Sequence, residues 1–292
     1  LTMLNNEVRT QNTSNQLDHP SWGSDWSSWE PNTVNASTIP LGSFELELAA
    51  IACDLPISDE LKLCIEPVLS IPMCASLPSD TSLLVSSSGK ERKTCISLLQ
   101  NAMLRVLTTI PPGKAKFTLI DPVGLGQTFA SVLHLADYEE SQLLDRAWTE
   151  PRHIETQLAR LTEHMETVIQ KYLRNEFESI DAYNKQAGEI AEPYRFLVIA
   201  DFPNNFSEIS CKRLASIVTS GARCGVHVII HRDYSLPLPA GIDDDTLNRI
   251  PIRIIEDGAT FSIDDEELRT LPLTLEAPPE EREMDVLIPP PP

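Results

Sequence analysis

Short apolar runs and longer amphipathic stretches alternate along the middle of the chain. The runs, which are typical of buried strands, cover residues 83–85, 116–120, 195–200 and 225–231. Apolar residues spaced three or four apart predict helices between them, at 94–107, 151–186 and 207–220. Because strands separated by helices imply right-handed crossovers, we expect an α/β fold with a mainly parallel sheet flanked by helices.

The flanking segments have weaker patterns. Residues 1–40 are rich in Asn, Ser, Thr and Trp and predict a poorly ordered lead-in, which three tryptophans make suited to docking. Apolar runs broken by prolines predict a short β segment at 41–80. The main domain is expected at 81–275, where it ends in short strands near 253–255, 260–262 and 271–275. An acidic, proline-rich linker is expected at 276–292.

Composition narrows the classes of function. The chain has 292 residues, of which 41% are hydrophobic, so it can bury a sizeable core. Its formal net charge of −20 repels phosphate backbones and argues against direct DNA binding. Six scattered cysteines without a C-x-x-C pair argue against a zinc site and favour thiols in the reducing cytoplasm.

The junction between the first apolar run and the helix that follows it is similar to a phosphate-binding loop. A working loop reads G-x-x-x-x-G-K-[ST], and this chain has SSGKERKT there. Lys93 and Thr94 stand where the phosphate lysine and the magnesium-binding hydroxyl belong, but Ser87 and Arg92 replace the two glycines. Such a loop works through backbone N–H groups and needs glycine where a Cβ would strike the ligand. The sequence therefore indicates a nucleotide-binding frame with a damaged site.

Two aspartates follow predicted strands at the same edge of the sheet as this loop. Ligands of parallel sheets bind outside the carboxyl ends of the strands. We therefore expect Asp121 to contact a bound nucleotide, with a cap on its own turn as the alternative. Asp201 and Thr94 are the expected ligands of Mg²⁺. Ser88 and Gly89 complete the candidate phosphate contacts.

An ordered series of motifs resembles the RecA-like motor domain of the FtsK/SpoIIIE family of hexameric DNA translocases and related secretion ATPases. After the loop come FTLIDPVGLG (117–126), LTEHMETVIQKYLRNEFESIDAYN (161–184), YRFLVIADFP (194–203) and SGARCGVHVIIHR (220–232). The resemblance covers roughly residues 80–235. It implies a RecA-like P-loop NTPase fold with ATP and Mg²⁺ as ligands. It also implies an adjacent intact ATPase domain as partner, hexamer formation, and the cytoplasmic part of a membrane-associated protein.

The chain departs from active members of that family at three functions. Both loop glycines are replaced, and Asp201 is followed by Phe202 and Pro203 where the family carries the glutamate that polarises water. The strand that ends in a polar sensor in the family ends here in HRD (231–233). Each loss raises the barrier to hydrolysis by several kcal/mol. The leading expectation is a non-hydrolysing domain, without catalytic residues of its own, that acts in assembly or regulation.

Two other functions stay open. One is an active motor domain that couples ATP hydrolysis to translocation of DNA or protein. Its catalytic candidates are Asp201 and, across a subunit interface, Arg223, for which a simple helix-end arginine is the alternative. Glu91 or Glu150 would then supply the base. The other is an α/β protein-interaction module that docks through its tryptophan-rich lead-in and acidic tail.

Overall fold

A computed structural model of the protein describes residues 19–26, 29–33, 37–47, 68–133, 143–174, 176–258 and 260–279. Its strands are β1 (Thr38–Glu47), β2 (Val68–Ser76), β3 (Leu83–Ser87), β4 (Ala115–Ile120), β5 (Leu144–Trp148), β6 (Tyr194–Phe202), β7 (Val226–Asp233), β8 (Ile252–Asp257), β9 (Thr260–Ile263) and β10 (Leu273–Leu275). Its α-helices are α4 (Arg92–Thr109), α5 (Ala130–Leu133), α6 (Pro151–Thr167), α7 (Ile180–Ala187), α8 (Glu208–Ser220) and α9 (Asp244–Leu247).

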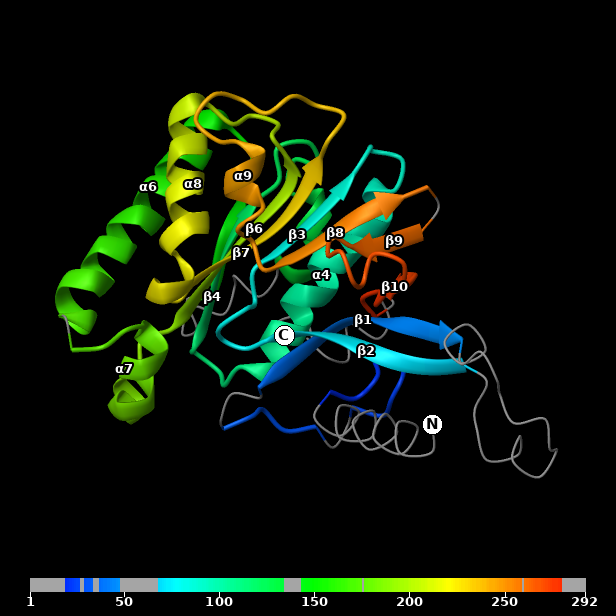
Figure 1. The fold of residues 1–292 in the computed structure, drawn as a ribbon. Coiled ribbons are helices and arrows are strands. Elements are labelled where there is room, and N and C mark those ends of the chain that lie inside the picture. Colours follow the sequence, from blue (N-terminus) through cyan, green and yellow to red (C-terminus); the bar gives the residue numbers. More distant parts are fainter. Residues whose placement is uncertain are drawn as a thin grey trace.

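All these strands join one sheet, in the order β2-β1-β10-β9-β8-β3-β7-β6-β4-β5. The six strands from β8 to β5 in that order run parallel. Helix α4 covers one face of this half, and α6 and α8 cover the other (Figure 1). This arrangement follows from right-handed crossovers in opposite directions along the sheet. The predicted α/β fold, with a mainly parallel sheet between helices, is confirmed.

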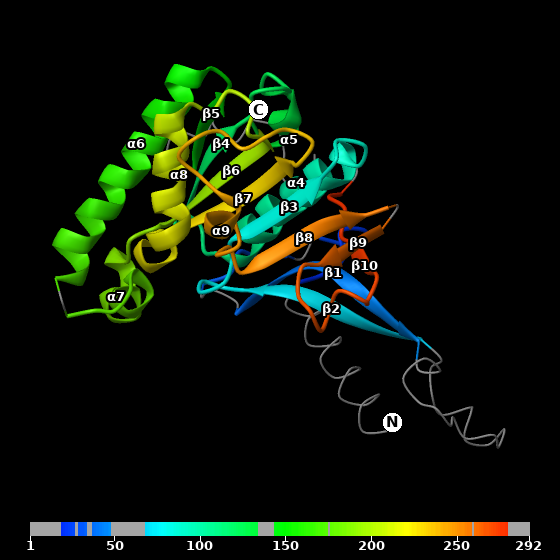
Figure 2. The same cartoon turned by 45° about the horizontal axis from the view of Figure 1, so that its top comes forward.

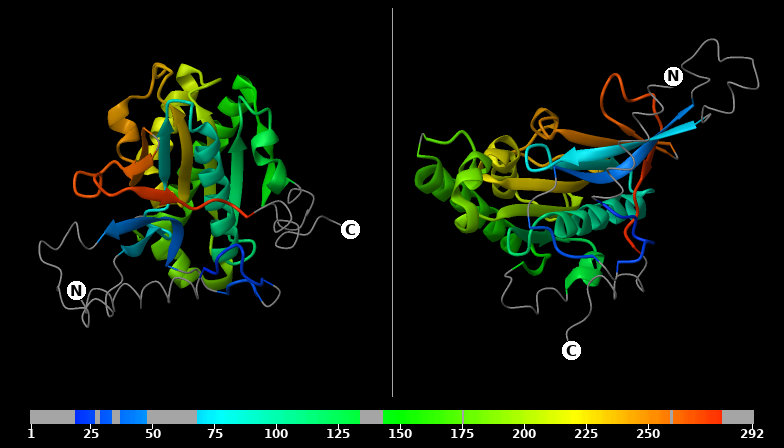
Figure 3. Two further views of the ribbon diagram at one scale, coloured as in Figure 1. Left: turned by 90° about the vertical axis from the view of Figure 1, so that its right-hand side faces the viewer. Right: turned by 90° about the horizontal axis from the view of Figure 1, so that it is seen from below.

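The other end of the sheet is antiparallel. β9 pairs with β8, β10 with β9, β1 with β10 and β2 with β1 (Figure 2). The strands predicted at 41–80 therefore extend the same sheet as the main domain, at the end away from α6 and α8 (Figure 3). β1 approaches β10 closely at Gly42, where a Cβ would come within 2.4 Å of the Thr274 carbonyl oxygen. Only glycine fits there.

Helix α4 is buried on more than the one face that its apolar spacing predicts. Its apolar residues, among them Leu99 and Met103, pack into the core against the sheet, from β6 and β7 to β1. Polar residues on the same helix, Asn101, Arg105 and Thr109, are also at most 1% exposed. The polar side of α4 is buried because segments from both ends of the chain cover it.

The segments that cover α4 meet at a cluster that we call the α4 clamp, formed by Trp22, Asn101, Arg105 and Glu276. The indole Nε1 of Trp22 donates to Asn101 Oδ1 at 2.7 Å, and the Arg105 guanidinium lies 3.9 Å above the indole ring. Asn101 also donates to Glu276, and Arg105 forms an ion pair with the same carboxylate. The described part of the lead-in is thus packed against the chain's own core, while residues 1–18 lie outside the described residues.

The helical region predicted at 151–186 is interrupted. Helix α6 passes into a π-helical segment, Val168–Leu173, and the chain then turns at Arg174, whose φ is 41°. A new helix, α7, starts after Ser179, whose hydroxyl accepts the Ala182 N–H. The prediction of one continuous helix over 151–186 is therefore wrong, because the N-cap at Ser179 begins a separate helix.

Two further expectations concern the membrane and the thiols. Within the described residues, no helix is both long and apolar enough to cross a bilayer. Among the described residues, Cys95, Cys211 and Cys224 are free thiols. Burial raises the pKa of Cys95, directly after the loop, to about 12, so this thiol stays protonated at neutral pH.

Candidate functional site

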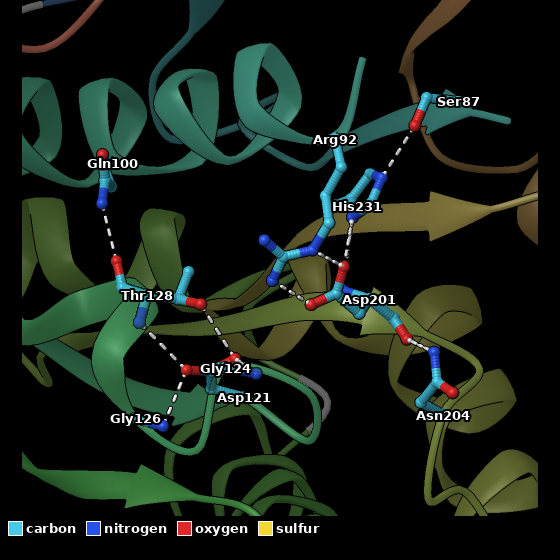
Figure 4. Close-up of polar contacts among 10 residues, drawn as sticks. All are labelled: Ser87, Arg92, Gln100, Asp121, Gly124, Gly126, Thr128, Asp201, Asn204 and His231. Atoms are coloured by element: carbon cyan, nitrogen blue, oxygen red, sulfur yellow. Dashed lines mark hydrogen bonds and ion pairs between the residues drawn. The ribbon is translucent and has the colours of Figure 1, made fainter. Parts of the chain in front are cut away.

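The carboxyl ends of β3, β6, β7 and β4 bring the predicted site residues together at one edge of the sheet (Figure 4). Residues 88–91 connect β3 to α4, so the loop has the place and the length that the sequence predicts for a phosphate-binding loop. Asp201 is the next-to-last residue of β6, and Asp121 directly follows β4. The hydrogen-bond partner of each of these side chains shows whether that side chain is available to a ligand.

Arg92, at the second glycine position of the loop, pairs with Asp201. Its Nε and Nη2 donate to the two carboxylate oxygens of Asp201, each at 2.6 Å. The Asp201 side chain is 5% exposed and that of Arg92 is 36% exposed. Bidentate, charge-assisted bonds of this kind are among the strongest that side chains form. The carboxylate expected to hold Mg²⁺ is thus already bound to a cation of the chain.

His231, on β7, links Asp201 to the loop from the other side. Its Nδ1 lies 3.3 Å from both the backbone N and Oδ1 of Asp201, and its Nε2 lies 3.0 Å from Ser87 Oγ. Asp201 has a φ of 56°, at an irregularity in the β6–β7 pairing, and this turns its N–H toward the imidazole. Burial raises the pKa of Asp201, but hydrogen bonds from His231 and Arg92, with the Arg92 charge, outweigh it and hold the pKa below its ordinary value.

Asp121 caps the turn that follows β4. Its carboxylate accepts the N–H groups of Gly124, Gly126 and Thr128 at 2.8–3.1 Å, and the Thr128 hydroxyl at 3.0 Å (Figure 4). The side chain is fully buried. These four bonds are those of the turn cap that the sequence leaves open as the alternative, and they use the carboxylate within its own loop. A contact between Asp121 and nucleotide stays a prediction.

Glu256, near the end of β8, accepts a hydrogen bond from the backbone N–H of Ser88 in the loop. Its carboxylate accepts the Ser88 N–H at 2.6 Å and the Ser88 hydroxyl at 3.0 and 3.2 Å. β8 lies next to β3, with Ile255 opposite Ser86, so Glu256 stands level with the point where β3 leaves the sheet. The N–H expected to face a phosphate therefore faces a carboxylate.

The remaining loop residues are arranged differently from a nucleotide-bound loop. The Thr94 hydroxyl donates to Glu91 at 3.0 Å. Gly89 is exposed and has a φ of 90°, which suits glycine. Lys93 is exposed and makes no ion pair with the described residues. The lysine position of the loop is thus accessible, whereas the hydroxyl position has an internal partner.

Phe202 takes the place of a water-activating residue. It is fully buried, and its ring packs edge-on against Phe206 with the centroids 4.9 Å apart. An apolar ring in the core accepts no proton, so this position supplies no general base.

Arg223 lies at the opposite edge of the sheet, before β7 begins. It is exposed, and its Nε donates to the Glu178 carbonyl oxygen at 2.7 Å. The structure therefore separates Arg223 from the loop of its own chain. A role across a subunit interface stays a prediction.

The residues at this edge do not fit a magnesium nucleotide in their present arrangement. Asp201 is paired with Arg92, Asp121 caps its turn and Thr94 is bonded to Glu91. Among the described residues, no group of three or more His, Cys, Asp or Glu side chains is placed to hold a metal ion. No hydrolytic step is therefore derived for this site.

Sequence reasoning missed Glu256 altogether, and it noted His231 at the end of its strand without predicting its contact with Asp201. His231 ends a buried run at the edge of the sheet that carries Asp201, and this position was the signal that its side chain could contact Asp201. Glu256 gives no such signal, because only the strand order places β8 beside β3.

Comparison with protein-family models gives no match, and comparison with curated proteins gives none either. Solved structures do match. EssC (ATPases 2 and 3) from Geobacillus thermodenitrificans matches 88% of this chain with a TM-score of 0.62 at 15% identity. The fold is that of the EssC ATPase domains.

Two structures from Thermomonospora curvata extend this likeness. EccC (ATPases 2 and 3), in complex with a signal sequence peptide, matches 86% of this chain at 12% identity, with a TM-score of 0.56. The cytoplasmic domain of the type VII secretion ATPase EccC matches 88% at 14% identity, with a TM-score of 0.53. This chain covers 50% of the EssC structure and 46% and 30% of the two EccC structures.

Proposed function

We propose that this chain is a non-hydrolysing ATPase-like domain of an FtsK/SpoIIIE-type secretion ATPase, and that it acts in assembly or regulation beside a catalytic domain. The observation that carries the proposal is the ion pair between Arg92 and Asp201. It places a fixed cation on the carboxylate that the family uses for Mg²⁺.

The energetics of the pair support a site that does not turn over ATP. A metal ion at Asp201 would have to displace two charge-assisted hydrogen bonds at a buried carboxylate. The released Arg92 side chain would then have to find other partners. Even with a metal in place, Phe202 supplies no base to the attacking water. Binding and chemistry are thus both opposed by the residues at this edge.

The matched structures support the proposed partners. The name of the EssC structure gives it two ATPase domains, ATPases 2 and 3. This chain covers half of that structure, which is the share expected of one of two adjacent domains. We infer an adjacent ATPase domain as the partner and hexamer formation in the whole protein. The acidic composition supports a role in secretion without direct DNA contact. The EccC match supports a place on the cytoplasmic side of a membrane.

Titration with a fluorescent ATP analogue and Mg²⁺, followed by an assay of phosphate release, tests this proposal. The proteins are the unchanged chain, Lys93→Ala, and the matched control Lys171→Ala, which removes an exposed lysine far from the loop. We expect no saturable binding below about 1 mM nucleotide and no phosphate release from any of them. Mg²⁺-dependent hydrolysis that Lys93→Ala abolishes and Lys171→Ala retains would overturn the proposal and support the active motor domain.

A further inference from the structure

Two side chains at the carboxyl edge carry the charges that a magnesium nucleotide would bring. The Glu256 carboxylate, an anion, accepts from the Ser88 N–H and hydroxyl. The Arg92 guanidinium, a cation, binds both oxygens of Asp201. In a working loop the same amide would face a phosphate and the same aspartate would face the metal.

We propose that the site is self-occupied, with Glu256 in place of a phosphate and Arg92 in place of the metal ion. This inference rests on the proposed function, because it names the internal groups that take the places of the ligands at a site proposed not to hydrolyse ATP. The loop joins β3 to α4, and the carboxylate reaches it from β8, the neighbouring strand. The contact therefore joins β8 to the start of the loop, at the amide that directly follows β3.

Charge gives the contact a direct consequence for ligands. An anion that approaches the Ser88 amide meets the carboxylate of Glu256 within hydrogen-bond distance of that amide. Two like charges at such a separation repel strongly where the surroundings are partly buried. Phosphate groups are therefore excluded while Glu256 is in place, and neutralising Glu256 should open the loop to them.

A simpler role for Glu256 predicts a different result. A carboxylate that only satisfies an N–H group at the end of β3 would add stability without excluding a ligand. Its removal would then destabilise the protein and leave anion binding unchanged. The two roles are distinguished by anion binding, which a purely structural contact does not alter.

Calorimetric titration with inorganic pyrophosphate, without metal, is the test. The variants are Glu256→Ala, Glu256→Gln and the matched control Glu267→Ala, which removes one exposed carboxylate elsewhere. We expect Glu256→Ala to bind pyrophosphate at least about tenfold more tightly than the unchanged chain and than the control. Glu256→Gln keeps the shape and an acceptor but loses the charge, so its affinity for pyrophosphate should lie between that of the unchanged chain and that of Glu256→Ala.

The outcomes separate this inference from the proposed function. Equal binding by the unchanged chain and Glu256→Gln, with both proteins folded by circular dichroism, would overturn the self-occupied site and leave the non-hydrolysing domain intact. A gain in Glu267→Ala as large as that in Glu256→Ala would overturn it too, because net charge would then explain the effect. Hydrolysis of ATP by the unchanged chain would instead contradict the proposed function.

Discussion

His227, in the middle of β7, is a polar side chain in an apolar environment. It is 1% exposed, and its ring stacks on Phe196 with the centroids 5.5 Å apart. Neither ring nitrogen has a hydrogen-bond partner among the described residues. Burial lowers the pKa of His227 to about 4, so the imidazole is neutral in the folded protein at neutral pH.

This burial makes stability depend on pH. Because the ordinary pKa of histidine is about 6.5, the unfolded chain binds a proton between roughly pH 6.5 and pH 4 that the folded chain does not. The free energy of unfolding therefore falls as the pH falls through that window, by about 2 kcal/mol at pH 5 for this residue.

His227→Phe should remove that loss while keeping the stacked packing. We expect the variant to gain stability over the unchanged protein, and to gain about 2 kcal/mol more at pH 5 than at pH 7.5. Guanidinium unfolding at both pH values measures the difference. His153→Phe, at a half-exposed surface position, is the control for the replacement of a histidine by an aromatic ring. A gain for His227→Phe that is equal at both pH values would contradict this account.

Single residues of the edge were partly predictable from the sequence. Strand ends and the loop register, which can be read from local spacing, indicate that Asp201 and Arg92 lie at one edge of the sheet, while a ligand role for Asp201 stays a prediction. Their ion pair was not predicted, since it joins residues 109 positions apart. The local pattern shows where a side chain is, whereas its partner depends on the order of the strands.

At the level of elements, the turn after β4 is built around one carboxylate. Asp121 accepts three backbone N–H groups of the turn, and at Gly124 a Cβ would come within 2.7 Å of both carboxylate oxygens. Glycine is therefore required where the backbone approaches Asp121 most closely. The turn and its aspartate form one unit.

Asp121→Ala should loosen this turn. It leaves three N–H groups without their acceptor, and we expect a loss of about 3 kcal/mol in the free energy of unfolding. The free energy of unfolding of Asp121→Asn should lie between those of the unchanged protein and Asp121→Ala, because the amide oxygen of the asparagine still accepts hydrogen bonds. Hydrogen exchange at residues 124–128, together with urea unfolding, measures both effects. Asp257→Ala, at an exposed site, is the control. Unchanged exchange in Asp121→Ala would contradict the capping role.

The division between α6 and α7 shows a limit of periodicity at the same scale. Apolar residues continue at helical spacing past Thr167, so the pattern alone predicts one helix. The chain instead turns at Arg174 and restarts at the Ser179 cap. A serine followed by an acidic first turn was a signal for a new helix, and it is weaker than an apolar stripe.

For the whole molecule, the α4 clamp determines which segments belong to the folded unit. Trp22 is 7% exposed and Arg105 is 1% exposed, and Glu276 supplies the carboxylate that balances Arg105. The unit that packs around α4 thus includes residues on both sides of the 81–275 range predicted for the main domain. Those boundaries stay a prediction.

Trp22→Ala should destabilise the entire fold. Removing a buried indole leaves a cavity beside Arg105 and removes the donor to Asn101, and we expect a loss of about 3–5 kcal/mol. Trp29→Ala removes a half-buried tryptophan of the same segment and is the matched control. Guanidinium unfolding compares the two. Equal, small losses in both would contradict the clamp.

The parallel half of the sheet was predictable because crossover rules need only the alternation of strands and helices. The antiparallel end was not, since β1 and β10 pair residues more than 200 positions apart. No local pattern identifies such partners, and the same long separation hid Glu256 from sequence reasoning.

The α4 clamp also fixes how mechanical load enters the molecule. Trp22 and Glu276 both form hydrogen bonds with Asn101 of α4, so tension on either segment of the chain reaches this helix. Arg92 is the first residue of that helix, and the turn before it carries the Ser88 amide. Tension at Glu276 would also load the short strand β10, which directly precedes it, so α4 and β10 would share the load on that side.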